Sequence, residues 1–263
     1  MMMCIFLIML GCIIQARMGS TRLPGKVMKL LDGNNPSISS TISQLKQCTE
    51  IDKIIVATTT NQEDNVIADY VENLGIDLFR GSADDVLGRY YECARKYSLS
   101  GILRVTADCP LIDPTIVDTG LKIFKNGNYD YVTNTLNRTF PDGNETEIFS
   151  FKSLEYAYND ANLPSEREHV TPYFKTHPEL FKNKNFENTE NLSHLRWTMD
   201  YDVDFKFIKL ILEKISKRPI LMTDILELLK NEPDLKKINS DHHPDEGYQK
   251  SLLEDKQFLD SKN

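Results

Sequence analysis

The sequence predicts an α/β fold in which a doubly wound, mostly parallel sheet is joined to a smaller α+β portion. Short apolar runs alternate with segments of helical periodicity up to about residue 135, the pattern of parallel strands connected by helices. Beyond that point the alternation weakens. We therefore expect a single domain, 1–263, with two halves, 10–135 and 136–232, and a polar tail, 233–263.

The strands of the first half are predicted from apolar runs bounded by polar or turn residues. "KIIVATT" at 53–59 is β-branched over most of its length, which indicates a buried strand. The strands expected in this half are 10–16, 53–59, 76–81, 101–108 and 129–134.

The helices of the first half are predicted from apolar spacing and from residues that cap helix ends. Gly75 is typical of a residue just beyond a helix, Ser82 and Asp113 of N-caps, and Pro114 of a first helical position. The helices expected here are 61–75, 82–98 and 113–127.

The second half contains fewer clear patterns. We expect strands at 145–151 and 194–200, and Pro172 should break the helix that begins near residue 165. Further helices are expected at 150–161, 202–216 and 222–233, and the tail should form a surface helix or remain mobile.

The net charge of −8, from 31 basic and 39 acidic residues, disfavours a broad nucleic-acid surface. Five cysteines without C-x-x-C spacing indicate a reduced, cytoplasmic chain without a zinc site. The uncharged run at 1–14 is shorter than the roughly 20 residues of a membrane span. It also lacks the basic leading region of a signal peptide. We expect no membrane association, and Met9 is a plausible initiator.

The stretch "ARMGSTRLPGK", residues 16–26, follows the first expected strand and points to an anion site. It is not a Walker A loop, because five residues separate Gly19 from Gly25 and Val27 stands where a hydroxyl is needed. Arginine forks onto phosphate oxygens, lysine acts as a point charge, and small residues let backbone N–H groups approach a ligand. A solvated basic loop is about equally compatible with the charges, but a position after a strand of an α/β sheet favours a ligand site.

Two aspartates end predicted strands and could hold a metal ion. Asp108 follows "GILRVTA" and Asp200 follows "HLRWTM". Magnesium bound to a nucleotide takes one or two protein carboxylates. Taken singly, Asp108 could be a turn residue before Pro110, and Asp200 could be an N-cap.

Two further stretches have a functional and a structural interpretation. Arg80, Gly81 and Ser82 leave a strand and enter a helix N-terminus, which suits either a ligand edge or simple capping. "SEREHVTPY" at 165–173 could be a charged helix face, or it could present Arg167 and His169 to an anion. Because the chain is acidic overall, an acidic substrate would need local cations. The candidate contacts are Arg167, His169 and Arg196, with Glu147 as a polar partner.

The motifs resemble those of a known family. "ARMGSTRLPGK" closely resembles the first motif of CMP-Kdo synthetases and of the wider acylneuraminate cytidylyltransferases. "GSADDVLGRYY", "TADCPLIDP" and "SEREHVTPY" look like the branch named for spore-coat polysaccharide biosynthesis protein F. The resemblance runs from about residue 11 to 250.

The resemblance implies a Rossmann-like nucleotide-diphospho-sugar transferase fold, with 10–135 as the nucleotide-binding half and 136–232 as the half for substrate binding and dimerisation. It implies a homodimer that transfers CMP from CTP to a hydroxyl of an acidic sugar and releases pyrophosphate. By motif match, Asp108 and Asp200 would bind Mg²⁺ and act with Arg17 and Lys26 in catalysis. The nucleotide contacts implied are Ala16, Arg17, Gly19, Ser20, Arg22, Lys26, Arg80, Gly81 and Ser82.

The sequence also departs from this family. Cys109 and Pro110 follow Asp108 where the Kdo enzymes carry Glu-Pro, which puts Kdo itself in doubt as the substrate. Two alternatives remain open at this stage. A GT-A glycosyltransferase would typically carry a D-x-D motif, which Asp108-Cys-Pro lacks. A non-catalytic sugar-nucleotide binding protein would not need the retained Arg, Lys and Asp set.

Overall fold

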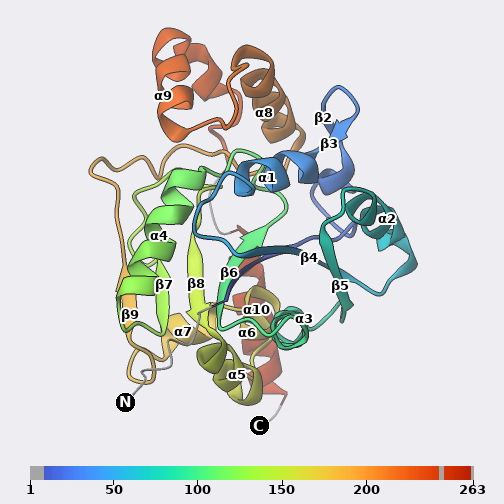
Figure 1. Ribbon diagram of the computed structural model, residues 1–263, viewed down its shortest axis with the longest axis vertical. Helices are drawn as coiled ribbons and strands as arrows, with labels where there is room; N and C mark the ends of the chain where they lie inside the picture. Colours follow the sequence, from blue (N-terminus) through green and yellow to red (C-terminus); the bar gives the residue numbers. More distant parts are fainter. Residues whose placement is uncertain (1–8, 243–245, 262–263) are drawn as a thin grey trace, which may run out of the picture.

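The central feature of the computed structural model is one mixed β-sheet (Figure 1). The model describes residues 9–242 and 246–261. Within them, seven strands lie in the order β5–β4–β1–β6–β8–β7–β9, and β8 alone runs antiparallel to its neighbours. These strands are β1 (Leu10–Gln15), β4 (Lys53–Thr59), β5 (Asp77–Gly81), β6 (Gly101–Thr106), β7 (Tyr131–Thr133), β8 (Glu147–Ser150) and β9 (Asn183–Asn185).

Helices cover both faces of the sheet. One face packs against α1 (Ser37–Leu45), α2 (Asn65–Asn73) and α4 (Pro114–Asn126). The other face packs against α3 (Val86–Lys96), α5 (Phe151–Asp160) and α7 (Pro172–Thr176), with α6 (Pro164–His169) beside α3. The mostly parallel, doubly wound sheet predicted from the sequence is confirmed.

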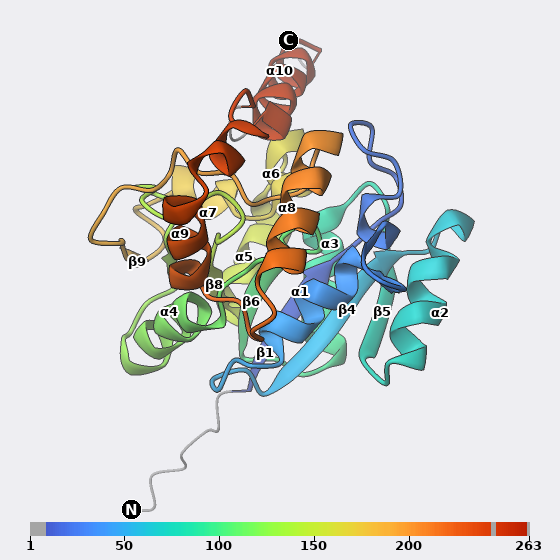
Figure 2. The same ribbon diagram turned by 90° about the horizontal axis from the view of Figure 1, so that it is seen from above.

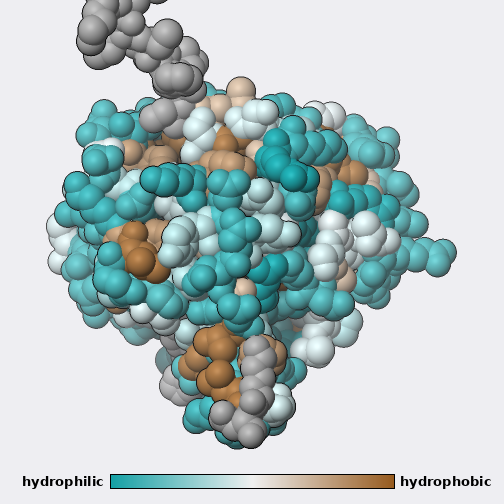
Figure 3. Space-filling model, turned by 90° about the horizontal axis from the view of Figure 1, so that it is seen from below, coloured by the Kyte–Doolittle hydropathy of each residue, from teal (hydrophilic) through white to brown (hydrophobic). Residues whose placement is uncertain are grey.

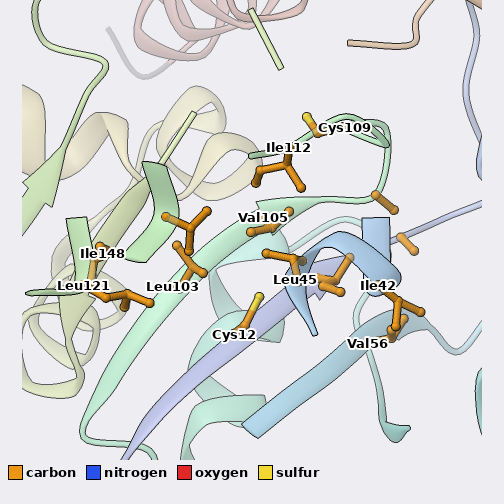
Figure 4. Close-up of a cluster of buried hydrophobic side chains, with 14 of the residues drawn as sticks. Cys12, Ile42, Leu45, Val56, Leu103, Val105, Cys109, Ile112, Leu121 and Ile148 are labelled. Atoms are coloured by element: carbon orange, nitrogen blue, oxygen red, sulfur yellow. The ribbon is translucent and has the colours of Figure 1, made fainter. Parts of the chain in front are cut away.

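The apolar run in β1 shows why the sheet needs two helical layers. Alternate side chains of a strand point to opposite faces, so Cys12 and Ile14 join one buried cluster while Ile13 joins the other. Figure 4 shows the first cluster, where Cys12 lies near Leu45 of α1 and side chains of β6. A fully buried aliphatic side chain contributes roughly 1.5–3 kcal/mol, so a strand buried on both faces is apolar throughout.

A third apolar cluster lies above the sheet. It is formed by α8 (Asp202–Lys214), α9 (Met222–Asn231) and η3 (Pro233–Lys237), and the small hairpin β2 (Leu30–Asp32) and β3 (Asn35–Pro36) packs beside it (Figures 1 and 2). Trp197 is 1% exposed within this cluster. The remaining elements are η1 (Lys26–Met28), η2 (Gln62–Asp64) and α10 (Glu246–Asp260).

The predicted strand at 194–200 is wrong. This stretch makes an isolated bridge, between Asp142 and Arg196, and is held by Trp197 N–H to Asp142 O (2.7 Å) and Met199 N–H to Asp108 O (2.9 Å). The alternation of apolar and polar residues in this stretch has another cause. Leu195, Trp197 and Met199 enter the third cluster, while the residues between them are polar. An extended segment between two loops has the same period as a strand.

The predicted cap of α3 is also wrong. The N-cap is Asp85 rather than Ser82, since its carboxylate accepts from Gly88 N–H (2.8 Å) and the helix begins at Val86. Ser82 instead accepts from Asp85 N–H (3.1 Å). In contrast, Asp113 caps α4 as expected, accepting from Thr115 N–H (2.7 Å).

The ends of the chain are only partly described. The tail forms η3 and α10, so its expected helix is confirmed over Glu246–Asp260. The residues at 1–8, and with them most of the N-terminal run and Cys4, lie outside the described part. Among the residues described, no helix is both long and apolar enough to cross a bilayer.

Candidate active site

A cleft opens where β1 and β6 end. These parallel strands are paired in register, with Gln15 opposite Thr106, so the segments that follow them emerge side by side. The cleft has a larger compartment of about 760 Å³ and a smaller one of about 370 Å³. Both compartments are bordered by Arg22, Arg104, Thr106, Asp108, His169 and Gly247.

The basic loop, residues 16–26, borders the larger compartment and is held to the sheet by its backbone. Ala16 N–H donates to Ala57 O (3.1 Å), and Met18 N–H donates to the buried Asp64 carboxylate (2.6 Å). Gly25 N–H returns to Met18 O (3.1 Å), which closes a turn. Gly25 has φ +65°, a left-handed conformation that glycine adopts without strain. The loop is therefore fixed before any ligand arrives.

Lys26 joins the two predicted metal aspartates. Its Nζ donates to Asp200 Oδ1 (2.7 Å) and also to Asp108, and its side chain is 11% exposed. Burial alone would raise the pKa of Asp108, but Lys26 lowers it to about 2. Burial would lower the pKa of Lys26, yet the two carboxylates raise it above its ordinary value. The predicted convergence of Asp108 and Asp200 is confirmed, while their role as magnesium ligands stays a prediction.

Arginines fix the position of Asp200. Arg22 donates to its Oδ1 (2.7 Å) and Arg196 to its Oδ2 (3.0 Å). Arg196 also donates to Asp142 (2.8 Å) and to the fully buried Asp204 (3.0 Å). Arg196 borders the smaller compartment, as its predicted substrate role requires, but its guanidinium already holds three carboxylates.

Arg17 forms an ion pair across the larger compartment. Its guanidinium donates to Glu168 Oε1 (2.7 Å), and both side chains are partly exposed, at 40% and 30%. In "SEREHVTPY" the residues predicted to face an anion were Arg167 and His169, and a role for Glu168 was not predicted. No local pattern could have shown this pair, because its members are separated by 151 positions.

A buried ion cluster borders the smaller compartment, and we call it the Glu147 cluster. Glu147 accepts from Arg104 (2.6 Å), Lys175 (3.0 Å), Tyr131 (2.7 Å) and Thr171 (2.7 Å). Burial would raise the pKa of Glu147, but Lys175 and Arg104 hold it well below the ordinary value. Sequence reasoning missed both cations, although an arginine inside the apolar run "GILRVTA" was a usable signal.

His169 lies where the two compartments meet. Its Nε2 is 3.0 Å from Ser251 Oγ, and its ring stands edge-on to Tyr248 with centroids 5.4 Å apart. Burial, helped by Arg104, lowers the pKa of His169 to about 4, so the imidazole is neutral near pH 7. Its neighbour Arg167 borders only the larger compartment, where it donates to Tyr158 O (2.8 Å) and to Asp85.

The structure does not bring Arg80, Gly81 and Ser82 to the border of either compartment. Arg80 donates to the carbonyls of Thr59 (2.9 Å) and Asn61 (3.0 Å). A Cβ at Gly81 would lie 3.1 Å from the side chain of the buried Arg89, so glycine here allows close packing. Their predicted contact with the nucleotide stays a prediction.

Comparison with known proteins identifies the family. The sequence matches the cytidylyltransferase family over residues 11–237. It is 32% identical over 232 residues to the spore coat polysaccharide biosynthesis protein SpsF of Bacillus subtilis, covering 84% of this chain and 94% of that protein. It is 27% identical over 189 residues to 3-deoxy-manno-octulosonate cytidylyltransferase of Chlorobium chlorochromatii, covering 70% of this chain and 69% of that protein.

A solved structure agrees with these sequence matches. The structure of a cytidylyltransferase from Leptospira borgpetersenii superposes with a TM-score of 0.85 at 33% identity, covering 90% of this chain and 100% of that one. The family match favours a nucleotidyltransferase over the glycosyltransferase and the non-catalytic binding protein. The chain therefore belongs to the cytidylyltransferase family and is a CTP-dependent nucleotidyltransferase with a Rossmann-like fold.

Proposed function

We propose that the enzyme transfers CMP from CTP to a hydroxyl of an acidic sugar, such as a nonulosonic acid or a Kdo-like sugar, for surface polysaccharide synthesis. The names of two relatives support this proposal. One is a spore coat polysaccharide biosynthesis protein, and the other is a cytidylyltransferase for 3-deoxy-manno-octulosonate, an acidic sugar.

The charge of the Glu147 cluster is the observation that best supports an acidic acceptor. One carboxylate, Glu147, faces two cations, Arg104 and Lys175, at the border of the smaller compartment. Arg104 is 13% exposed at its side chain, so the surplus positive charge is poorly screened by water. A second carboxylate, brought by the acceptor, would balance it. We therefore propose that the acidic group of the sugar lies beside Arg104 and Lys175.

The larger compartment suits the triphosphate. Arg17 and Lys26 are proposed to hold its oxygens and to offset the charge that develops on the departing pyrophosphate. The acceptor hydroxyl oxygen forms a bond to the α-phosphorus and loses its proton. The bond from the α-phosphorus to the bridging oxygen breaks, and pyrophosphate takes the electron pair. Arg17 and Lys26 form ion pairs with carboxylates in the structure, so the phosphates of CTP must replace those carboxylates.

Asp108 and Asp200 fit a magnesium ion when the nucleotide supplies further ligands. Their oxygens are hard ligands, and both accept from one amine, so they lie close together. Within the described residues, no group of three or more His, Cys, Asp or Glu side chains could hold a metal. We propose that phosphate and water oxygens complete the shell. A bound magnesium ion would stabilise negative charge on the phosphates as a Lewis acid.

Pyrophosphate release tests the proposal. Purified enzyme is mixed with CTP, magnesium and either Kdo or a nonulosonic acid, with the matching neutral sugar alcohol as control. We expect release with an acid and CTP, none with the neutral sugar, and loss after chelation. Release with the neutral sugar alone would contradict the acidic acceptor.

The assembly and the location of the enzyme also stay proposals. The resemblance implies a homodimer, and the cysteine pattern favours the cytoplasm. Sedimentation of the purified protein at micromolar concentration would show a dimer, and a single monomeric species would contradict it.

A further inference from the structure

The C-terminal helix α10 borders the catalytic cleft although it lies outside the segment that matches the family, residues 11–237. Figure 2 shows α10 beside α6, and the two helices are in contact. Both compartments are bordered by Gly247, the smaller one also by Tyr248, and the larger one also by Lys250, Ser251 and Glu254.

Polar contacts fix α10 against α6. Ser165 N–H donates to Asp255 Oδ1 (2.8 Å), and both residues are buried, at 2% and 6% exposed. One turn nearer the start of α10, Ser251 Oγ lies 3.0 Å from His169 Nε2. A buried polar contact holds its geometry because breaking it would leave a desolvated group without a partner. These contacts therefore hold α10 in one orientation about its own axis.

That orientation turns one face of α10 to the cleft and the other to solvent. Gly247, Ser251 and Glu254 recur at steps of four and three residues, which is one helical face. Leu253 and Leu259 lie outward, at 58% and 50% exposed. Figure 3 shows apolar side chains at the surface of the projecting end at its bottom.

Lys250 differs from the other cations of the larger compartment. Arg17, Arg22 and Lys26 each have a carboxylate partner at 2.7 Å. Within the described part of the chain, the carboxylate that pairs with Lys250 is Glu254, at 3.9 Å, and the Lys250 side chain is 75% exposed. A phosphate group entering this compartment would meet Lys250 without first displacing a tight ion pair.

We infer that α10 is a substrate-binding wall of this enzyme, and that Lys250 contributes a cation to the phosphates of CTP. The inference rests on the proposed function, since it takes the larger compartment as the triphosphate site. Tyr248 extends the same wall into the smaller compartment. A part of the chain outside the family match would then help to set nucleotide affinity.

Calorimetric titration with CTP and magnesium tests this inference. The variants are Lys250→Gln and, as a matched control, Lys256→Gln, which removes an exposed lysine of the same helix that does not border the cleft. Loss of a solvent-exposed ionic contact should raise the Kd for CTP about fivefold in the first variant. Lys256→Gln should bind CTP as the native protein does. Equal Kd values for the two variants would overturn the inference.

The same titration separates this inference from the proposed function. If the native protein binds CTP and Lys250→Gln binds it equally well, only the role of α10 fails. If the native protein does not bind CTP, the assignment of the larger compartment fails first. Hydrogen exchange on the unmodified protein gives a second measurement. CTP should slow hydrogen exchange of the backbone amides at 247–255. Unchanged exchange there would contradict the role of α10 as a substrate-binding wall.

Discussion

Two ion pairs of the cleft, Arg17–Glu168 and Arg104–Glu147, differ in how deeply they are buried. Arg17 and Glu168 are 40% and 30% exposed at their side chains, whereas Arg104 and Glu147 are 13% and 4% exposed. An exposed pair contributes little to stability and separates readily. A buried pair is held by the cost of leaving one charge alone in a low-dielectric surrounding. The first pair can therefore separate when a ligand competes for one of its members, while the second keeps its geometry.

The largest effect is expected at Asp200, which accepts from Arg22 and Lys26 of the basic loop and from Arg196. Asp200→Asn should abolish magnesium-dependent turnover, because it removes a charge from the proposed metal site. Circular dichroism should show a retained fold, since the amide oxygen can still accept from Arg22 and Arg196 keeps its bonds to Asp142 and Asp204. Asp202→Asn, at a side chain 76% exposed, is the control. Turnover at the native rate in Asp200→Asn would exclude the metal role.

The Glu147 cluster should be the more costly pair to break. Glu147→Gln leaves Arg104 and Lys175 facing each other without a carboxylate, which should lower the free energy of unfolding by about 3–5 kcal/mol. Glu168→Gln should lower it by about 1 kcal/mol or less. Urea denaturation measures both variants. Equal losses would show that burial does not distinguish the two pairs.

Arg17 should show the opposite balance between activity and stability. Arg17→Ala should reduce turnover on the order of 100- to 1000-fold, the usual loss for one contact to a charge in the transition state. Its melting temperature should stay close to that of the native protein, since the pair with Glu168 is exposed. Arg95→Ala, at a side chain 62% exposed on α3, serves as control. A parallel fall in melting temperature and rate would indicate a structural role.

The last effect appears only at acid pH and concerns His169. Its pKa in the folded protein is about 4 against an ordinary 6.5, so the unfolded chain binds a proton that the folded chain does not. Stability should therefore fall as pH drops from 6.5 towards 4, by about 3 kcal/mol at most. His169→Gln should flatten this part of the pH profile in urea denaturation. An unchanged profile would mean that the imidazole is not held neutral.

The sequence was most informative where a function depends on one local segment. The alternation of β1, β4 and β6 with helices predicted the sheet. The composition of the basic loop predicted an anion site just after β1. The sequence was misleading at 194–200, where the alternation of Leu195, Trp197 and Met199 arises from burial against helices rather than from strand pairing.

Partners from distant segments could not be predicted. Glu168, Lys175 and Tyr248 reach the cleft only through the packing of α6, α7 and α10. The residues around Lys175 and Tyr248 do not differ from those of an ordinary surface helix, and "SEREHVTPY" indicated the cations Arg167 and His169 rather than the pairing of Glu168. Their contribution depends on which helices the fold brings beside β6, and a single sequence contains no local signal for that choice.

The backbone bond from Met199 N–H to Asp108 O has a consequence for the entropy of ligand binding. The neighbouring contact from Thr198 to the same carbonyl spans 90 positions, and closing a flexible loop of that length costs on the order of 4 kcal/mol. The chain meets this cost once, when it folds. A ligand that uses both Asp108 and Asp200 need not order the segments that carry them. Its binding should therefore lose little chain entropy, even though the two carboxylates come from opposite halves of the protein.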